Sequence, residues 1–293
     1  MRVPLVYNPA SGGGKGRLRF REAESLLAAE GIQVDPHATL RPGHATELAR
    51  ELSDAGHEVL YIMGGDGTLS EAANGVLDSA KDPVLGFIPA GTGNDFLRDF
   101  EITRRAQAVD RIRFGTPRPI DAVHVHTDDT DRWCINIFGT GFAAQAADSA
   151  NRNFKWAGGQ AYNLGVMHQL LRLRPVQTTL TLDGQAVAGR FPMVMACNSI
   201  HTGGAMKMAP MARPDDGLVD VLYVDPVSRR ELIALLAGIR EGRHVRHDKV
   251  HFRRARKVRI EPEEPSPLLA DGEVYGRTPV DLEVHPGALR VLL

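Results

Sequence analysis

The sequence predicts an α/β protein of two lobes, an N-terminal β-α-β lobe followed by a mostly antiparallel, β-sandwich-like lobe. A chain of 293 residues is long enough for two domains. Over residues 1–120, short apolar runs alternate with helix-period segments, which is typical of a parallel sheet with crossover helices. From residue 121 onward, short β-branched or alternating runs replace that pattern, which is typical of antiparallel strands.

The N-terminal lobe takes its predicted strands from three buried apolar runs. These runs are RVPLVY, EVLYIM and VLGFIP. Segments 17–31 and 44–56 carry leucine and alanine near helical spacing, and each ends at a glycine, a common helix stop. We therefore expect a helix in each segment.

The C-terminal lobe is predicted for residues 121–280, because two prolines in TPRPID interrupt the helical pattern near 117–121. Its expected strands lie in TTLTLDGQAVAG, FPMVMACNS, GLVDVLYV, KVRIE and VDLEV. Two helix-like segments, QAYNLGVMHQLLRL and SRRELIALLAGIREG, interrupt these strands.

Composition excludes several classes of protein. The chain has 35 basic and 36 acidic residues and a net charge of -1, so no overall field favours nucleic acid. Cys134 and Cys197 lie in apolar runs without zinc-site spacing and are expected to be reduced core residues. The longest apolar run is far shorter than the roughly 20 residues that span a bilayer. We expect a cytoplasmic protein without a transmembrane segment, at most peripheral to a membrane.

Three glycine-rich segments follow the predicted strands. They are NPASGGGKG (8–16), GGDGT (64–68) and PAGTGND (89–95). Strand-to-helix loops of a parallel sheet all emerge at its carboxyl edge, so these segments should share a site. Glycines let successive N–H groups point at one anion, and a helix N-terminus adds a partial positive charge. One such loop is equally consistent with tight packing, but three on one edge predict a nucleotide-phosphate site.

Asp66 is an acid within this predicted anion site. A carboxylate beside polyphosphate is costly unless a divalent cation bridges the two, and Mg²⁺ is the usual bridge. The alternative is a helix N-cap, a position that also favours aspartate. The two roles are compatible, and the sequence leaves both open.

Taken together, these motifs resemble the diacylglycerol kinase catalytic domain, and above all the stand-alone bacterial lipid kinases of the NAD kinase and diacylglycerol kinase superfamily. The likeness continues through NIFGTGFAAQ, GGAMKMAPMARPDDGLVDV and LADGEVYGRTP, so it covers essentially the whole chain. Ala143 departs from it, because the family usually has aspartate there. In this fold, residues 281–293 would supply a last strand that returns to the N-terminal lobe.

The resemblance implies ATP as the phosphoryl donor and Mg²⁺ as the metal cofactor. It places the following residues at the ATP site: Asn8, Gly12, Lys15, Thr39, Gly64, Gly65, Asp66, Gly67, Thr68, Leu69, Ser70, Glu71, Thr92 and Asn94. Residue type alone would not have selected Thr39, since threonine near a strand end is ordinary.

The resemblance also assigns catalytic roles. Glu273 matches the residue that accepts the proton of the substrate hydroxyl, whereas the residues alone predict only a hairpin turn, as at Asp183. Asp66, Asp95 and Asp121 match acids that organise Mg²⁺ and water. Asp95 has a helix N-cap as its alternative role, and Asp121 that of a solvated loop acid.

A second metal site is implied in ARPDDGLVD. There the Asp216 carboxylate and the carbonyls of Arg213 and Leu218 would bind Mg²⁺ in a structural role. The alternative is a turn in which an aspartate bonds to its own backbone.

The implied function is ATP-dependent transfer of the γ-phosphate to a lipid hydroxyl of a diacylglycerol-like or phosphatidylglycerol-like acceptor, within phospholipid biosynthesis. An NAD kinase-like enzyme with a soluble substrate and a non-catalytic nucleotide sensor are the alternatives. The sequence leaves the oligomeric state open, a homodimer included.

Two segments are candidates for contact with lipid. Residues 240–259 hold nine Lys and Arg against two acids and could dock on an anionic membrane, although a solvated helix end and a charged edge strand are the favoured explanation. Residues 154–173 carry an apolar helical stripe that suits an acyl-chain pocket or ordinary core packing.

Overall fold

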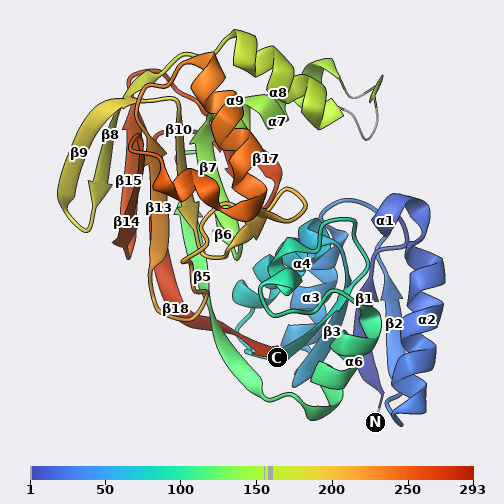
Figure 1. Ribbon diagram of the computed structural model, residues 1–293. Helices are drawn as coiled ribbons and strands as arrows, with labels where there is room; N and C mark the ends of the chain where they lie inside the picture. Colours follow the sequence, from blue (N-terminus) through green and yellow to red (C-terminus); the bar gives the residue numbers. More distant parts are fainter. Residues whose placement is uncertain (1, 155, 158–160) are drawn as a thin grey trace. The chain divides into compact units, whose positions relative to one another are not determined.

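The computed structural model describes residues 2–154, 156–157 and 161–293. The chain forms two compact units (Figure 1). The first comprises Met1–Ala122, Gly203–Ala205 and Pro286–Leu293, and the second Val123–Thr202 and Met206–His285. Within the described ranges, no helix is both long and apolar enough to cross a membrane.

The first unit is built on a parallel sheet in the strand order β2-β1-β3-β4. Its strands are β1 (Val3–Tyr7), β2 (Val34–Ala38), β3 (Val59–Gly64) and β4 (Val84–Pro89). Its helices are α1 (Ser11–Gly14), α2 (Gly16–Ala29), α3 (His44–Asp54), α4 (Asp66–Leu77), α5 (Asp95–Arg98) and α6 (Arg105–Phe114). Helices α3 and α4 pack together on one side of the sheet, and α2 packs with α6 on the other.

A close contact between α3 and α4 fixes the position of α4, the helix that follows β3. Thr46 Oγ1 donates a 2.8 Å hydrogen bond to the Glu71 carbonyl. Gly75 faces the Thr46 carbonyl so closely that a side-chain carbon there would overlap it, and would lie 2.9 Å from the Thr46 carbonyl carbon. The absence of a side chain at Gly75 is therefore what lets the two helices approach.

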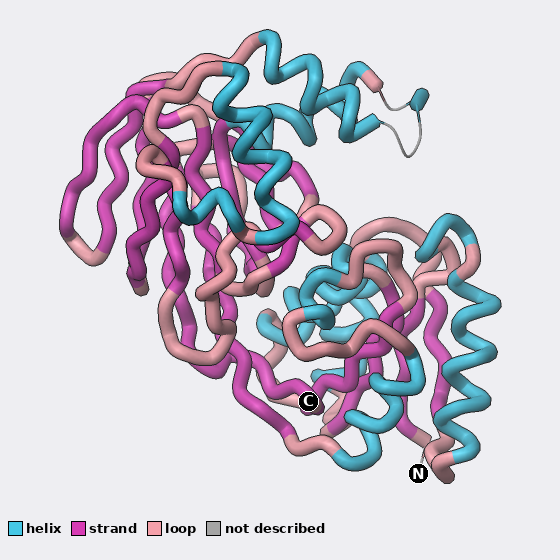
Figure 2. The backbone as a smooth tube through the Cα atoms, in the orientation of Figure 1, coloured by secondary structure: helices cyan, strands magenta, loops and turns pink. Residues whose placement is uncertain are grey.

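The second unit consists mainly of strands (Figure 2), and these strands pair antiparallel. One sheet has six strands in the order β14-β13-β10-β7-β16-β17, and β11 pairs with β12. Strands β5, β6, β18, β15, β8 and β9 belong to the same ten-stranded sheet as β2-β1-β3-β4. The strands are β5 (Pro117–His126), β6 (Asp131–Cys134), β7 (Ile137–Gly141), β8 (Val176–Leu182), β9 (Gln185–Phe191), β10 (Met193–Cys197), β11 (His201–Thr202), β12 (Met206–Lys207), β13 (Val219–Val224), β14 (Val250–Ala255), β15 (Lys257–Pro262), β16 (Pro267–Ala270), β17 (Glu273–Arg277) and β18 (Val280–Leu292).

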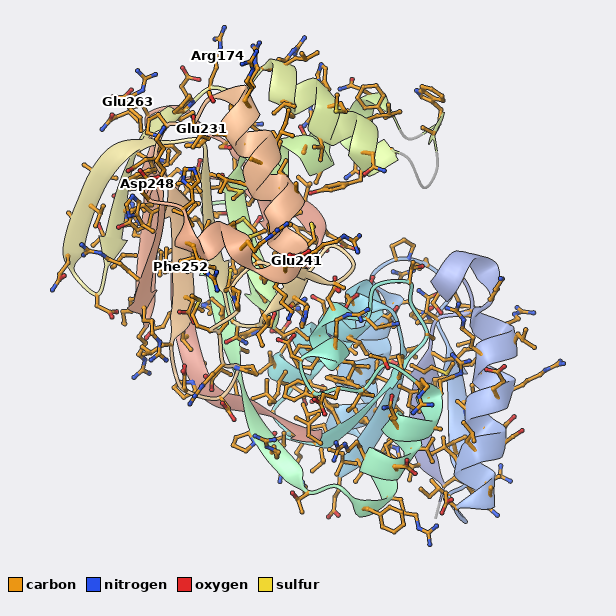
Figure 3. All side chains as sticks on the ribbon, in the orientation of Figure 1. Arg174, Glu231, Glu241, Asp248, Phe252 and Glu263 are labelled. Atoms are coloured by element: carbon orange, nitrogen blue, oxygen red, sulfur yellow. The ribbon has the colours of Figure 1, made fainter. Side chains whose placement is uncertain are left out.

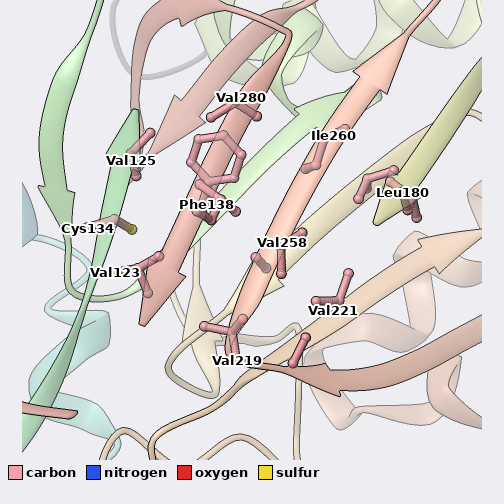
Figure 4. Packing of buried hydrophobic residues seen from close by; sticks show 14 of the residues in the cluster. Val123, Val125, Cys134, Phe138, Leu180, Val219, Val221, Val258, Ile260 and Val280 are labelled. Atoms are coloured by element: carbon pink, nitrogen blue, oxygen red, sulfur yellow. The ribbon is translucent and has the colours of Figure 1, made fainter. Parts of the chain in front are cut away.

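One core cluster of this unit is the layer between its two large sheets, and a second lies between the six-stranded sheet and the helices of this unit. Figure 4 shows Val123 and Cys134 from one sheet packed in the same cluster as Phe138 and Val221 from the other. Interdigitation of two inner faces is the usual core of a β-sandwich. The predicted fold class, an α/β lobe followed by a mostly antiparallel sandwich-like lobe, is thereby confirmed.

The last strand belongs to both units. The beginning of β18 pairs antiparallel with β15, from Val280 opposite Ile260 to Glu283 opposite Lys257. Its end pairs parallel with β4, where Arg290 lies opposite Val84. Residues Pro286–Leu293 are consequently counted with the first unit.

Among its described residues, the second unit contains a helix that was not predicted from the sequence. Helix α7 (Phe142–Asn153) precedes the expected α8 (Ala161–Leu171) and α9 (Arg229–Gly238), which are followed by the short turns η2 (Ile239–Glu241) and η3 (Arg243–Arg246). Alanines cover its buried face, and Gly165 of α8 lies against the Ala146 carbonyl. Ala143 is buried in this helix, so the residue that departs from the family pattern packs in the core.

Substitution of Gly75 by alanine tests the α3–α4 contact. We expect Gly75→Ala to lower the free energy of unfolding by about 1–3 kcal/mol, because an overpacked methyl forces the helices apart. The matched control is Gly238→Ala in α9, where a side-chain carbon would come no closer than 3.3 Å, to Arg243 Cβ. Urea denaturation of both variants is the measurement, and equal losses in the two would contradict the contact.

Candidate active site

The three glycine-rich loops meet at the carboxyl edge of the parallel sheet. Asn8 Nδ2, after β1, donates a 3.2 Å hydrogen bond to Thr68 Oγ1, at the start of α4. Arg19 of α2 donates to the carbonyls of Ala90 and Gly91 after β4, the latter at 3.3 Å. The first loop is therefore tied to the second, and the helix that follows it is tied to the third.

The second and third loops touch through two glycines. A side-chain carbon on Gly65 would lie 3.0 Å from Gly91 Cα, so neither position has room for a side chain. Asn94 closes the third loop, because its Oδ1 accepts from Gly91 N at 2.8 Å. In the first loop, Gly12 and Gly13 adopt φ of 60° and 73°, a region that favours glycine.

Helix α4 presents its N-terminus at this meeting point. Its N-cap is Gly65, which supplies no side-chain hydrogen bond. The first N–H groups of a helix have no partner within it, and together they favour a bound anion. Asp66 is the first residue of the helix rather than its cap, so the predicted N-cap role belongs to Gly65.

Asp66 and Asp95 point toward one small space beside Gly93. A carbon built on Gly93 would lie 3.1 Å from Asp66 Oδ2 and 3.3 Å from Asp95 Oδ2. Burial raises the pKa of the Asp66 carboxyl, and the charge of Asp95 raises it further, while the hydrogen bond from Phe96 N opposes the shift. Two convergent carboxylates with this electrostatic cost are suited to a divalent cation.

Asp95 is also bound from a distant part of the chain. Gly204 N and Ala205 N each donate a 2.8 Å hydrogen bond, one to each of its carboxylate oxygens. Arg98 Nε is 3.8 Å from Asp95 Oδ1. The carboxylate is almost fully buried, at 4% exposure, so Asp95 fastens residues 203–205 to the third loop.

Asp121 is buried at the junction of β5 and β18. Its Oδ1 accepts a 2.8 Å hydrogen bond from Gly287 N, and 2% of the residue is exposed. The alternative of a solvated loop acid is therefore wrong. This geometry gives Asp121 a role in holding the returning strand.

The remaining residues assigned to the ATP site occupy different environments. Glu71 accepts hydrogen bonds from Gly43 N at 3.0 Å and Ala45 N at 3.2 Å, so its carboxylate binds the start of α3. Among these residues, the exposed side chains are those of Lys15 and Thr92. Those that are buried in α4 are Thr68, Leu69 and Ser70. Gly64 ends β3, Gly67 lies in α4, and Thr39 N donates to the Tyr7 carbonyl.

Two contributors to these loops were missed from the sequence. Arg19 resembles the other basic residues of α2, and nothing in the pattern distinguishes it. The segment 203–205 carried a turn signal in its two glycines, but its attachment to Asp95 joins positions more than 100 residues apart. Only the folded chain reveals either contact.

Glu273 lies in the second unit, at the start of β17. Asp271 and Gly272, with φ of 50° and 89°, form the two-residue turn between β16 and β17. Asp183 and Gly184 form the same turn between β8 and β9, with φ of 47° and 84°. The predicted hairpin is therefore present, and Glu273 is exposed beside it.

Both oxygens of the Asp216 carboxylate already have protein partners. Oδ1 accepts from Leu218 N at 3.2 Å, and Oδ2 forms an ion pair with Arg254. The first contact is the backbone turn that was the alternative to a metal site. Because Arg254 already supplies a positive charge to the Asp216 carboxylate, these residues do not fit a metal cation as the structure arranges them. The metal site at Arg213, Asp216 and Leu218 stays a prediction.

The basic segment 240–259 is partly neutralised by nearby acids. Strand β14 is the edge of its sheet, as the alternative interpretation expected. Figure 3 labels Glu231, Glu241 and Asp248 around this region. Glu231 pairs with Lys249 at 2.8 Å, and Glu241 pairs with Arg243 at 3.0 Å.

The apolar segment 154–173 is only partly buried. Leu170 is in the core, whereas large side chains remain exposed at Trp156, Tyr162, Met167 and Leu171. Positions 155 and 158–160 of this segment lie outside the described residues. Core packing therefore accounts for part of the stripe and leaves an exposed apolar surface on α8.

Comparison with known proteins supplies the family. A model of the diacylglycerol kinase catalytic domain matches residues 2–125, and one of the YegS C-terminal NAD kinase beta sandwich-like domain matches residues 136–293. The diacylglycerol kinase of Bacillus subtilis (strain 168) is 30% identical over 281 residues, which are 95% of this chain and 91% of that protein.

Solved structures show the same fold. The crystal structure of a diacylglycerol kinase from Bacillus anthracis str. Sterne has a TM-score of 0.76 at 22% identity, covering 99% of this chain and 96% of that one. An NAD kinase from Archaeoglobus fulgidus in complex with ATP has a TM-score of 0.50 at 12% identity, covering 100% and 94%. Since the Bacillus subtilis diacylglycerol kinase is 30% identical over nearly the whole of both chains, and the catalytic-domain model matches residues 2–125, the protein belongs to the diacylglycerol kinase family of lipid kinases, which transfer a phosphoryl group to an alcohol.

Proposed function

We propose that this kinase transfers the γ-phosphate of ATP to the hydroxyl of a diacylglycerol-like lipid, with Mg²⁺ as cofactor. The observation that carries the proposal is the meeting of three glycine-rich loops around the N-terminus of α4, beside Asp66 and Asp95. Backbone N–H groups there can bind phosphate oxygens, and exposed Lys15 in the first loop adds a positive charge.

Asp66 is the residue proposed to hold Mg²⁺, with Asp95 beside it. The ion would neutralise charge on the β- and γ-phosphates as the phosphoryl group moves. Asp66 suits this role because its carboxylate is desolvated and close to a second acid, so a cation would relieve an existing electrostatic cost. Asp95 contributes negative charge while its oxygens remain hydrogen-bonded to residues 204 and 205.

Glu273 is proposed as the acceptor of the substrate proton. An alcohol becomes a better nucleophile when a carboxylate takes its proton as the new P–O bond forms. Glu273 is exposed on a firmly built hairpin, so its carboxylate is accessible to a bound hydroxyl. The acceptor itself is inferred from the relatives, whose names specify diacylglycerol, and a phosphatidylglycerol-like lipid is the second candidate.

Phosphate transfer from labelled ATP to a lipid panel tests the assignment. We expect Glu273→Gln to lower the rate by about 10²–10⁴-fold, because the proton acceptor is lost, and Asp66→Asn to lower it at least as much. The lipids tested are diacylglycerol and phosphatidylglycerol. NAD is tested beside them, and formation of NADP would identify the NAD kinase-like alternative.

Gln185 provides the matched control, because it occupies the equivalent position of the other Asp-Gly hairpin. Gln185→Ala should retain full activity. Activity that survives both Glu273→Gln and Asp66→Asn would refute the proposed mechanism.

The raised pKa of Asp66 predicts an effect on stability. A carboxyl whose pKa is raised by folding binds protons more readily in the folded state than in the unfolded state. The contribution of Asp66 to stability therefore falls as pH rises from its unfolded pKa through its folded pKa. At neutral pH in EDTA, Asp66→Asn should therefore have a higher Tm than the native protein. Added Mg²⁺ should raise the Tm of the native protein and leave that of Asp66→Asn unchanged.

Thermal unfolding with and without Mg²⁺ is the measurement for this prediction. Asp248→Asn is the control, since that side chain is 88% exposed. An equal response of all three proteins to Mg²⁺ would place the ion elsewhere.

The basic segment is proposed to hold the enzyme against an anionic membrane, where its acceptor resides. Arg253 and Arg256 are both exposed on or beside β14. Each basic residue near such a surface adds about 1 kcal/mol, so Arg253→Ala/Arg256→Ala should weaken vesicle binding about tenfold or more. Arg17→Ala/Arg21→Ala on α2 is the control, and sedimentation with phosphatidylglycerol vesicles is the assay. Binding that is indifferent to salt would rule out docking by charge.

A further inference from the structure

The Glu273 carboxylate has a polar neighbour on its own strand. Tyr275 lies two residues further along β17, and residues two apart on a strand project from the same face. Its hydroxyl donates a hydrogen bond to Glu273 Oε2. One carboxylate oxygen is thereby held by the protein, and in the part of the chain that the structure describes the other has no hydrogen-bond donor.

Arg132 fixes the ring of Tyr275 from strand β6, which belongs to the other sheet. Its guanidinium carbon lies 3.5 Å from the centre of the ring, a cation–π contact. The approach depends on Gly276, where φ is 51° and a side-chain carbon would lie 2.6 Å from Thr130 Oγ1. Strand β17 can therefore lie against the turn between β5 and β6.

The protonation of Tyr275 suits a permanent donor. Burial raises the pKa of the Tyr275 phenol to about 12, and the hydrogen bond to Glu273 contributes in the same direction, while Arg132 opposes it. The hydroxyl consequently keeps its proton at neutral pH. It can donate to the carboxylate throughout a reaction cycle.

The base of the same hairpin is anchored by Asp271. Its carboxylate accepts hydrogen bonds from Ile135 N at 3.1 Å, from Asn136 N at 2.9 Å and from the Cys134 thiol at 2.9 Å. Burial and the charge of Asp271 raise the pKa of that thiol, so it remains a donor. The backbone that carries Glu273 is fixed, and the conformation of its side chain remains for Tyr275 to select.

We propose that Tyr275, held by Arg132, is a positioning residue that orients the Glu273 carboxylate toward the acceptor hydroxyl. This inference rests on the proposed function, in which Glu273 accepts the substrate proton. During transfer the acceptor O–H bond breaks and its proton passes to the second oxygen of Glu273. The acceptor oxygen forms its bond to the γ-phosphorus while the bond from that phosphorus to the bridging oxygen of ATP breaks, so that ADP leaves. Tyr275 keeps its own proton.

The variant Tyr275→Phe isolates the hydroxyl, because phenylalanine preserves the ring and its contact with Arg132. We expect kcat to fall about tenfold through loss of orientation, with KM for ATP and Tm unchanged. The control is Tyr223→Phe, which removes the hydroxyl of a buried tyrosine in the same sheet. A purely structural role would leave kcat of Tyr275→Phe at the native value, and that result would overturn the inference.

A double-mutant cycle separates this inference from the proposed function. If Tyr275 acts through Glu273, then Glu273→Gln/Tyr275→Phe should be no slower than Glu273→Gln alone. A further tenfold loss in the double variant would show that Tyr275 acts independently, against the inference. Full activity of Glu273→Gln would instead refute the role of Glu273 and the inference with it. If Glu273→Gln is inactive but Tyr275→Phe keeps the native kcat, only the positioning role is refuted.

Discussion

The approach of Gly65 to Gly91 is the contact on which the candidate nucleotide site depends. With no side chain at either position, the loops after β3 and β4 lie against each other. Asp66 and Asp95 come after these glycines in their loops, so the same contact brings two carboxylates to one space beside Gly93. Desolvation and mutual repulsion make that arrangement costly, and the backbone hydrogen bonds of Asp95 help to maintain it.

The second unit shows how little a turn motif by itself says about function. Asp183-Gly184 and Asp271-Gly272 have nearly the same backbone angles and close the same kind of hairpin. The Asp183 carboxylate accepts from Lys257 N, and Asp271 accepts from backbone groups at 135 and 136. The two hairpins differ in the strand after the turn, where Glu273 has Tyr275 and Arg132 close by.

Much of the fold can be predicted from pattern, and the exceptions have physical reasons. Strand β4 coincides with the predicted run, because an apolar segment bounded by loops fits a buried parallel strand. Helix α7 was not predicted, and its buried face consists mainly of alanine. Its stability comes from close packing on α8, a contact that local sequence does not encode.

The sequence by itself determined the family motifs, the loops after the strands, and the residue types available for binding phosphate and a cation. Those features are local, since glycine spacing and apolar runs act over a few residues. Only the tertiary structure decided that Arg19 and residues 203–205 support the loops. The same is true of the ion pair between Arg254 and Asp216 and of the hydrogen bond from Tyr275 to Glu273. Apart from the last, these contacts join distant parts of the chain. All four depend on strand register and side-chain direction, which emerge only when the chain packs.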